Sequence, residues 1–186
     1  MYHYSHRITR WLLCFLISTL PLGTLEASKP DRRVYETKML KLVVIPRTPQ
    51  QMAAFYEGRG FPAKAIAETR TACFFTIGLH NKTRDILWLD TANWQFQAAT
   101  GPLKRISREE WKQRWQKLEL AQSYQSTFRW TLLPAKLDFQ PDEREGGNIT
   151  LPRTEKPSSL RATFAPGTDK PGPRIEAEIK DQRCAE

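Results

Sequence analysis

Short segments in which apolar and polar residues alternate recur along the sequence, and no other feature constrains the fold as strongly. Side chains of a β-strand point alternately to its two faces, so a period of two predicts a strand with one buried face. The clearest example covers residues 72–80, where the apolar positions are Cys73, Phe75, Ile77 and Leu79. The sequence therefore predicts a protein built mainly from β-strands.

Comparable patterns occur at several other places, each bounded by proline, glycine or polar turn residues. Strands are predicted at residues 34–45, 85–90, 94–96, 127–133, 137–139, 149–151, 160–164 and 175–179. Pro46 is expected to end the first of these, because proline has no backbone N–H to donate. Residues 81–83 are expected to form the tip of a hairpin after the 72–80 strand.

The segment 48–69 carries helix signals instead. Thr48 is a good N-cap, and Gln51 has the spacing to complete a capping box with it. This helix is expected to end near residues 58–60, where two glycines occur, and a second short helix to follow over 62–68. We therefore expect a helical insertion between the first two strands.

A second helical signal covers residues 107–120. Ser107 and Glu110 have the spacing of a capping box, and Ile106 can pack on Trp111 as a hydrophobic staple. Apolar side chains then recur at helical spacing, at Trp111, Trp115 and Leu118. This segment is expected to be an amphipathic helix with one apolar face.

Seven or eight short strands, separated by turns and interrupted twice by helix, predict the fold class. We expect a mainly β protein, an immunoglobulin-like antiparallel β-sandwich with two helical insertions at about 48–69 and 107–120. No internal repeat or glycine/serine-rich linker divides the chain. Residues 34–186 are therefore expected to form a single β-sandwich domain, preceded by a flexible N-terminal segment at 28–33.

Residues 1–27 have the three parts of a secretory signal peptide. Arg7 and Arg10 form a positive flank, and the apolar segment 11–20 follows. The small residue Ala27 then suits a cleavage site. We expect export to a periplasm or to the extracellular space, and an uncleaved N-terminal anchor is the alternative.

Two cysteines, Cys73 and Cys184, follow the predicted signal peptide. In an oxidising compartment an even number of cysteines predicts a disulfide, which here would tie the C-terminal tail to the sheet. Two free thiols are the alternative. Redox catalysis and metal binding are not favoured, because the sequence has no C-x-x-C motif and His80 is the one histidine after residue 27.

The sequence gives little sign of catalysis. General acid–base and nucleophilic mechanisms usually employ histidine or a positioned thiol, and His80 is predicted to be an exposed polar residue at a strand end. We therefore expect no enzyme activity, no cofactor and no metal. The enzyme class that stays open is a hydrolase that cleaves an envelope polymer with paired carboxylates.

Acidic residues gather around a predicted turn, and they raise the question of a calcium site. They are Asp138, Asp142, Glu143 and Glu145, with Asn148 nearby. Their spacing does not match a calcium-binding loop, and Arg144 lies among them. A solvated turn is the better interpretation.

Basic residues are concentrated around the second helical segment, in a chain whose net charge is +9. Between residues 104 and 117 they are Lys104, Arg105, Arg108, Lys112, Arg114 and Lys117. A basic helix that carries Trp111 and Trp115 can rest on an anionic surface such as lipid headgroups or an acidic polymer. The alternative is that the helix buries its tryptophans in the domain and shows water only its basic face. Nucleic acid is not expected as the partner of an exported protein.

Two tripeptides match the acceptor pattern for N-glycosylation, at residues 81–83 and 148–150. The first of them falls in the turn that is expected to follow the 72–80 strand. Asn81 is therefore predicted to be exposed.

Together these observations favour an exported, non-catalytic envelope protein that binds or scaffolds a partner. The partner is expected to be another envelope protein, contacted through a sheet edge or through the 48–69 insertion. One alternative is binding to an anionic surface through the helix at 104–117. The other is the hydrolase with paired carboxylates.

Overall fold

The computed structural model describes residues 31–170 and 172–186. The predicted signal peptide at 1–27 and residues 28–30 of the predicted flexible segment lie outside these ranges. Arg33, the last residue of that predicted segment, already belongs to the first strand. The first strand therefore begins one residue earlier than expected.

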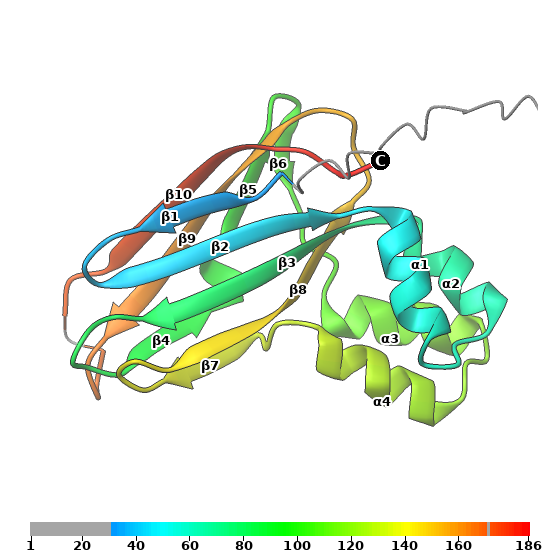
Figure 1. The fold of residues 1–186 in the computed structure, drawn as a ribbon, viewed down its shortest axis with the longest axis horizontal. Helices are drawn as coiled ribbons and strands as arrows, with labels where there is room; N and C mark the ends of the chain where they lie inside the picture. Colours follow the sequence, from blue (N-terminus) through cyan, green and yellow to red (C-terminus); the bar gives the residue numbers. More distant parts are fainter. Residues whose placement is uncertain (1–30, 171) are drawn as a thin grey trace, which may run out of the picture.

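Ten strands and four α-helices make up the described part of the chain (Figure 1). The strands are β1 (Arg33–Glu36), β2 (Leu40–Arg47), β3 (Ala72–Asn81), β4 (Leu87–Asp90), β5 (Gln95–Ala98), β6 (Gly101–Leu103), β7 (Lys136–Phe139), β8 (Arg144–Pro152), β9 (Ser158–Pro166) and β10 (Ile175–Gln182). The helices are α1 (Pro49–Glu57), α2 (Ala63–Thr69), α3 (Arg108–Lys117) and α4 (Gln122–Thr131), with a 3₁₀ turn at Thr91–Asn93. None of the helices in these ranges is long and apolar enough to cross a lipid bilayer.

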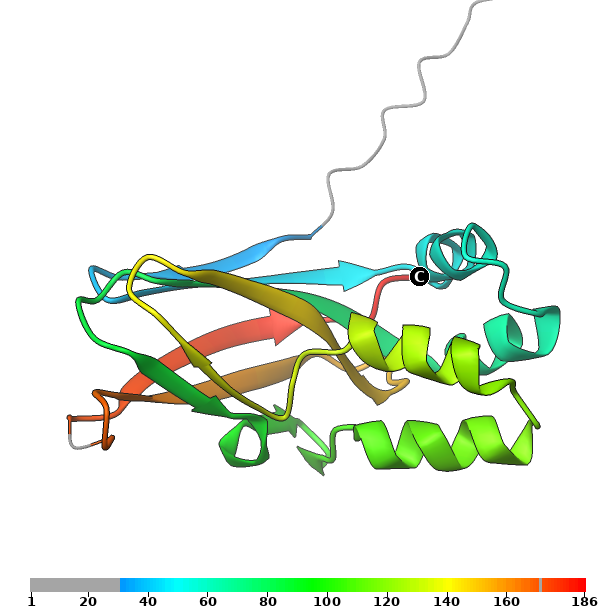
Figure 2. The same ribbon diagram turned by 90° about the horizontal axis from the view of Figure 1, so that it is seen from below.

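The strands form two sheets, and within each sheet every pair of neighbouring strands is antiparallel. The first sheet has the order β1-β2-β3-β8, and the second has the order β6-β5-β9-β4-β7, with β10 on the other side of β9. Figure 2 shows the two sheets as separate layers, with the helices gathered at one end. The prediction of a mainly β protein is confirmed.

The main hydrophobic core lies between the two sheets. It contains the predicted apolar face of β3, with Cys73, Phe75, Ile77 and Leu79 each at most 3 % exposed. The second sheet contributes the apolar positions of β9 and β10 to the same core. The alternating pattern in the sequence therefore identified the facing sides of both sheets.

A second hydrophobic core lies among the four helices, at the end of the molecule where β3 begins (Figure 1). Phe128 of α4 is at its centre, because its ring lies 4.7 Å from that of Trp111, 4.8 Å from that of Trp115 and 5.3 Å from that of Tyr56. Phe74 on the outer side of β3 joins this cluster. Aromatic packing thus attaches the helices to the first sheet.

Two of the helices begin where the sequence predicted. Thr48 accepts a hydrogen bond from the backbone N–H of Gln51, and the Gln51 side chain accepts one from the N–H of Thr48. Ser107 and Glu110 form the same reciprocal pair at the start of α3. Both capping boxes are confirmed, since each satisfies N–H groups that a helix start leaves unpaired.

The prediction of a single strand at 34–45 is wrong, because these residues form two antiparallel strands, β1 and the first part of β2, joined as a hairpin. The Thr37 hydroxyl accepts hydrogen bonds from the N–H groups of Met39 and Leu40, which turns the chain between the two strands. Pro46 does not end β2 either, which continues to Arg47. Proline is tolerated there because it lies beyond the part of β2 that pairs with β1.

The strand predicted at 127–133 is also wrong, because most of it belongs to α4. Phe128 is 1 % exposed and Leu132 is 5 % exposed, whereas Trp130 between them is 85 % exposed. A spacing of four residues fits a helix, whereas a strand would have buried all three. The second helical insertion therefore extends to Thr131 instead of ending near residue 120.

The predicted hairpin at residues 81–83 is absent from the described structure. β3 continues to Asn81, which pairs with Leu40 of β2. The chain then crosses to the second sheet, where β4 pairs with β7 and β9. Both partners of β4 come much later in the sequence, so local turn signals could not identify them.

The outer edge of β8 is covered by the two segments that connect the sheets to α3 and α4. The Ile106 N–H donates to the Thr150 carbonyl at 2.9 Å, and the Leu133 N–H donates to the Asn148 carbonyl at 2.9 Å. The backbone of Leu133 passes so close to β8 that it leaves no room for a side chain at Gly147. A Cβ there would lie 2.5 Å from the Leu133 nitrogen and 2.7 Å from its Cα.

Replacing Gly147 by alanine is expected to lower the free energy of unfolding by about 2 to 3 kcal/mol, the upper part of the range typical of overpacking. The atoms in the way belong to the backbone, so relief requires Leu133 to move away from β8 and its hydrogen bond to Asn148 to lengthen. Urea denaturation of the purified variant measures the loss.

The matched control is Gly78→Ala on the neighbouring strand. A Cβ at Gly78 would lie 3.7 Å from the Cβ of Val43, which is an ordinary contact. We expect this variant to stay within about 1 kcal/mol of the unmodified protein. Equal losses from both substitutions would contradict the steric explanation.

Candidate functional site

A groove with a volume of about 520 Å³ lies between α3 and α4. The two helices run side by side at one end of the molecule (Figure 2). Its lining combines aromatic and basic side chains with one carboxylate, and it includes Arg108, Glu109, Lys112, Trp115, Phe128 and Arg129. We call it the α3–α4 groove. Binding sites are typically concave, with an apolar floor and a few polar groups.

The floor of the α3–α4 groove is apolar and closely packed. Trp111 and Trp115 stack with their ring centres 5.0 Å apart, and each is 1 % exposed. The indole N–H of Trp111 donates to the Thr150 hydroxyl of β8 at 2.8 Å, which holds α3 on the first sheet. The floor of the groove is therefore closely packed and attached to the first sheet.

Arg108 links the two walls of the groove. Its Nη2 donates to the Leu132 carbonyl at the end of α4, at 2.6 Å. Burial lowers the pKa of the Arg108 guanidinium, and the nearby charges of Arg129 and Arg105 lower it further. Arg129 and Arg105 thus lie close enough to Arg108 for their charges to oppose its own.

No carboxylate in the described ranges forms an ion pair with any of these three arginines. Burial also lowers the pKa of Arg105, although the charges of Asp90 and Glu110 oppose this effect. Arginines without an ion-pair partner beside an apolar floor are suited to an anionic ligand.

Two buried N–H donors from residues of the groove lack a hydrogen-bond partner within the residues that the structure describes. They are the Nε of Arg108 and the Nε1 of Trp115. Buried donors are nearly always paired in folded proteins, because a lost hydrogen bond to water costs about 1 to 3 kcal/mol. Such exceptions call for an explanation.

Trp130 is by far the most exposed large apolar side chain in the described structure. It is 85 % exposed, whereas Val34 and Met39, the other two of this kind, are 46 % and 47 % exposed. It follows Arg129, which lines the groove, on α4. Tryptophan and arginine are both enriched at the energetic centres of protein interfaces.

The six basic residues of the predicted binding helix do not form one free surface. Lys104 pairs with Glu110 at 3.1 Å, and Lys112 lies 3.9 Å from Glu109. Two of the six, Arg108 and Lys112, line the α3–α4 groove, Arg105 is half-buried near Arg108, and Lys117 is exposed. The remaining residue, Arg114, is turned toward α2.

Arg114 pairs with Glu68 at 3.0 Å, and its guanidinium lies 4.8 Å above the ring of Trp111. The tryptophans of this helix are buried in the groove floor, as the alternative interpretation of the sequence expected. Sequence reasoning missed Arg129 and Trp130, because both lie in the segment that it assigned to a strand.

A disulfide joins Cys73 to Cys184, with their Cα atoms 5.3 Å apart. Cys73 lies in the core between the sheets, and Cys184 packs against the edge of that core. The bond therefore attaches the C-terminal segment to β3. Neither cysteine is among the residues that line the groove.

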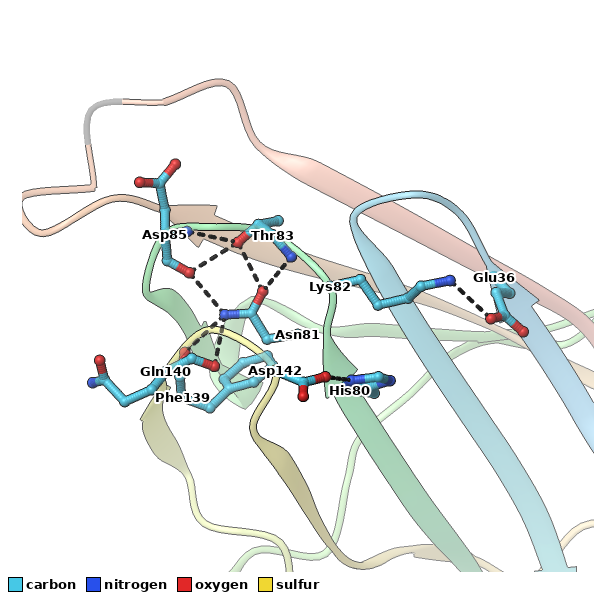
Figure 3. A network of polar contacts seen from close by, with 9 residues as sticks. All are labelled: Glu36, His80, Asn81, Lys82, Thr83, Asp85, Phe139, Gln140 and Asp142. Atoms are coloured by element: carbon cyan, nitrogen blue, oxygen red, sulfur yellow. Dashed lines mark hydrogen bonds and ion pairs between the residues drawn. The ribbon is translucent and has the colours of Figure 1, made fainter.

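The end of the molecule opposite the helices carries a network of polar contacts (Figure 3). His80, predicted to be exposed, is only 17 % exposed, and its Nε2 lies 2.6 Å from Oδ1 of Asp142. Hydrogen bonding to His80 lowers the pKa of Asp142. On the neighbouring strands, hydrogen bonds from Lys41 and Lys82 lower the pKa of Glu36 to about 2.

Asn81 lies at the centre of this network and is completely buried, so the prediction that it is exposed is wrong. Its Nδ2 lies 2.8 Å from the Asp85 carbonyl and 3.0 Å from those of Phe139 and Gln140 (Figure 3). Its Oδ1 accepts from the Thr83 hydroxyl. The amide fixes the chain crossing between the sheets and is inaccessible to a modifying enzyme in the folded protein.

The acidic residues around the β7–β8 turn take part in ordinary turn contacts. Glu143 accepts a hydrogen bond from the Gln140 N–H at 2.6 Å, and Asp142 contacts His80. Over the described ranges, no three His, Cys, Asp or Glu side chains come together in a way that could hold a metal ion.

Comparison with known proteins gives little guidance. The sequence matches no protein-family model and no curated protein. Among solved structures, the fold is similar to a crystal structure from Bacillus subtilis subsp. subtilis str. 168 of ycdA, described as a candidate lipoprotein. The two chains are 9 % identical, and the match has a TM-score of 0.42. It covers 80 % of this chain and 38 % of the other, so this chain spans well under half of that protein's length.

Proposed function

We propose that the protein is exported to the cell envelope and acts there as a non-catalytic module that binds another protein through the α3–α4 groove and Trp130. The observation that carries the proposal is the uncompensated charge of Arg108 and Arg129 next to an apolar floor. A partner segment with acidic and apolar side chains would match both parts of the lining. Trp130 would supply a large apolar contact beside the groove.

A protein partner is favoured over an anionic membrane or polymer surface by the shape of the site. The groove is concave, so it would accept a protruding chain segment better than a flat layer of headgroups. Trp111 and Trp115, which a membrane-bound helix would insert among lipids, are each only 1 % exposed. The proposal also includes the predicted immunoglobulin-like character of the domain, which two antiparallel sheets around one core support.

Trp130→Ala is expected to weaken binding of the partner at least about tenfold, the effect of losing an interface tryptophan. The experiment immobilises the purified protein, captures binding proteins from an envelope extract, and measures the dissociation constant of each purified candidate. Arg129→Gln should also weaken binding, and more strongly at low than at high salt, because it removes an electrostatic attraction.

Arg161→Gln is the matched control, since it removes one exposed positive charge from β9, outside the groove. It should leave binding unchanged. A partner counts as supporting the proposal only if it depends on Trp130 and Arg129 and contacts the groove with an acidic segment. If every captured protein binds the two groove variants as tightly as the unmodified protein, the proposal is wrong.

A further inference from the structure

Four buried N–H donors lack a partner in the described structure, and two of them belong to residues of the α3–α4 groove; the other two are Arg33 Nε in β1 and Trp94 Nε1. The other indole groups behave as expected: Trp111 donates to Thr150, and Trp88 donates to the Gly167 carbonyl, both at 2.8 Å. Trp94 is the exception, but it lies in the core between the two sheets, away from the groove. Trp115, by contrast, is one of the residues that line the α3–α4 groove, together with Arg108, Lys112 and Arg129.

The orphaned Nε of Arg108 belongs to the same groove. The guanidinium of Arg108 already uses its Nη2 to donate to the Leu132 carbonyl, which connects α3 to the end of α4. Arg129 adds a second charge from α4. Lys112 is partly neutralised by Glu109, which leaves the two arginines as the positive groups that an incoming ligand would meet.

A carboxylate has the chemistry that these groups require. It is planar, carries one negative charge and only accepts hydrogen bonds, so it can receive an arginine N–H and an indole N–H together. The short aliphatic stem of an acidic residue would fit the aromatic floor formed by Trp111, Trp115 and Phe128. A larger, doubly charged phosphate would place two charges where the lining offers much apolar surface.

We infer that the α3–α4 groove contains a carboxylate subsite formed by Arg108, Trp115 and Arg129. The inference rests on the proposed function, and it states which group of the partner is recognised. Both donors are buried in the free protein, so binding of the carboxylate includes a local rearrangement of the groove lining that brings them within its reach. Arg129 balances the charge of the bound group.

The indole N–H signals of the purified protein in a ¹⁵N-correlated NMR spectrum provide the test. The probes are an acetylated, amidated peptide that alternates leucine with glutamate, its glutamine counterpart, and inorganic phosphate at matched ionic strength. The glutamate peptide is expected to shift the Trp115 signal downfield in a saturable way. The Trp94 signal, which is equally unpartnered but lies between the sheets, should stay in place.

Two variants separate the subsite from general attraction by charge. Arg108→Lys keeps the charge but lacks the Nε donor, and it should weaken the glutamate peptide about tenfold. Arg129 is exposed, so Arg129→Gln should fold normally and also weaken it. Arg161→Gln should have no effect. A Trp115→Phe variant assigns the signal by removing it.

The inference is overturned if the Trp115 signal does not move, if the glutamine peptide moves it equally, or if phosphate alone moves it. These outcomes differ from a failure of the proposed function. A captured partner that depends on Trp130 but leaves the Trp115 signal unchanged would remove the subsite and keep the binding module. If the glutamate peptide shifts the Trp115 signal in a saturable way but no captured partner depends on Trp130, the subsite is kept and the proposed binding module is removed.

Discussion

Removing the Cys73–Cys184 disulfide is expected to lower the free energy of unfolding by about 4 to 5 kcal/mol. The two cysteines are 111 residues apart in the sequence, and a cross-link over such a long loop greatly restricts the unfolded chain. Cys184→Ser is the suitable variant, because Cys184 lies at the rim of the core whereas Cys73 is 2 % exposed within it. Guanidinium denaturation measures the loss.

The unmodified protein with its disulfide reduced serves as the control, and its denaturation curve should coincide with that of Cys184→Ser. Mass spectrometry of protein isolated without reductant should find both thiols oxidised. If the variant loses less than about 1 kcal/mol, the bond contributes little to stability, and the loop-closure explanation fails.

Phe128→Ala is expected to lower the free energy of unfolding by about 3 to 5 kcal/mol, the range for removing a large aromatic side chain from a core. Phe128 contacts aromatic rings from α1, α3 and β3, so its loss leaves a cavity at the point where three elements meet. Far-ultraviolet circular dichroism during urea unfolding measures the effect. Some helical signal should also be lost at low denaturant, because this contact holds α4 in place.

Trp130→Ala, two residues further along the same helix, is the matched control for Phe128→Ala. Because Trp130 is 85 % exposed, its removal should change stability by no more than about 0.5 kcal/mol. In a strand with alternating faces, positions 128 and 130 would be buried alike, and the two variants would be equally destabilised. That result would contradict the assignment of these residues to helix α4.

The contrast between these two positions shows why some of the fold could be predicted and some could not. In β3 the alternation reflects burial directly, since one face meets the other sheet. In residues 127–133 an accidental alternation of aromatic residues conceals a helix, and the decision depends on contacts with Tyr56 and Trp111 far away in the sequence. Periodicity reports one face of an element but not what that face meets.

The candidate site was only half accessible to prediction for the same reason. Lys104 to Lys117 stood out as a basic segment, and Arg108 and Lys112 do line the groove. The other wall comes from α4, so Arg129 could not be placed opposite Arg108 without knowledge of how the helices pack. Capping boxes, by contrast, involve residues three apart and were predicted correctly at both helices.

The covered edge of β8 has a consequence for how this molecule can meet other chains. An unpaired strand edge is an open template on which a foreign strand can add, and it underlies both strand-addition complexes and aggregation. At Asn148 and Thr150 that template is already filled by the chain's own backbone. A foreign strand therefore cannot pair with β8 at these two positions, and recognition at this part of the edge has to rely on side chains.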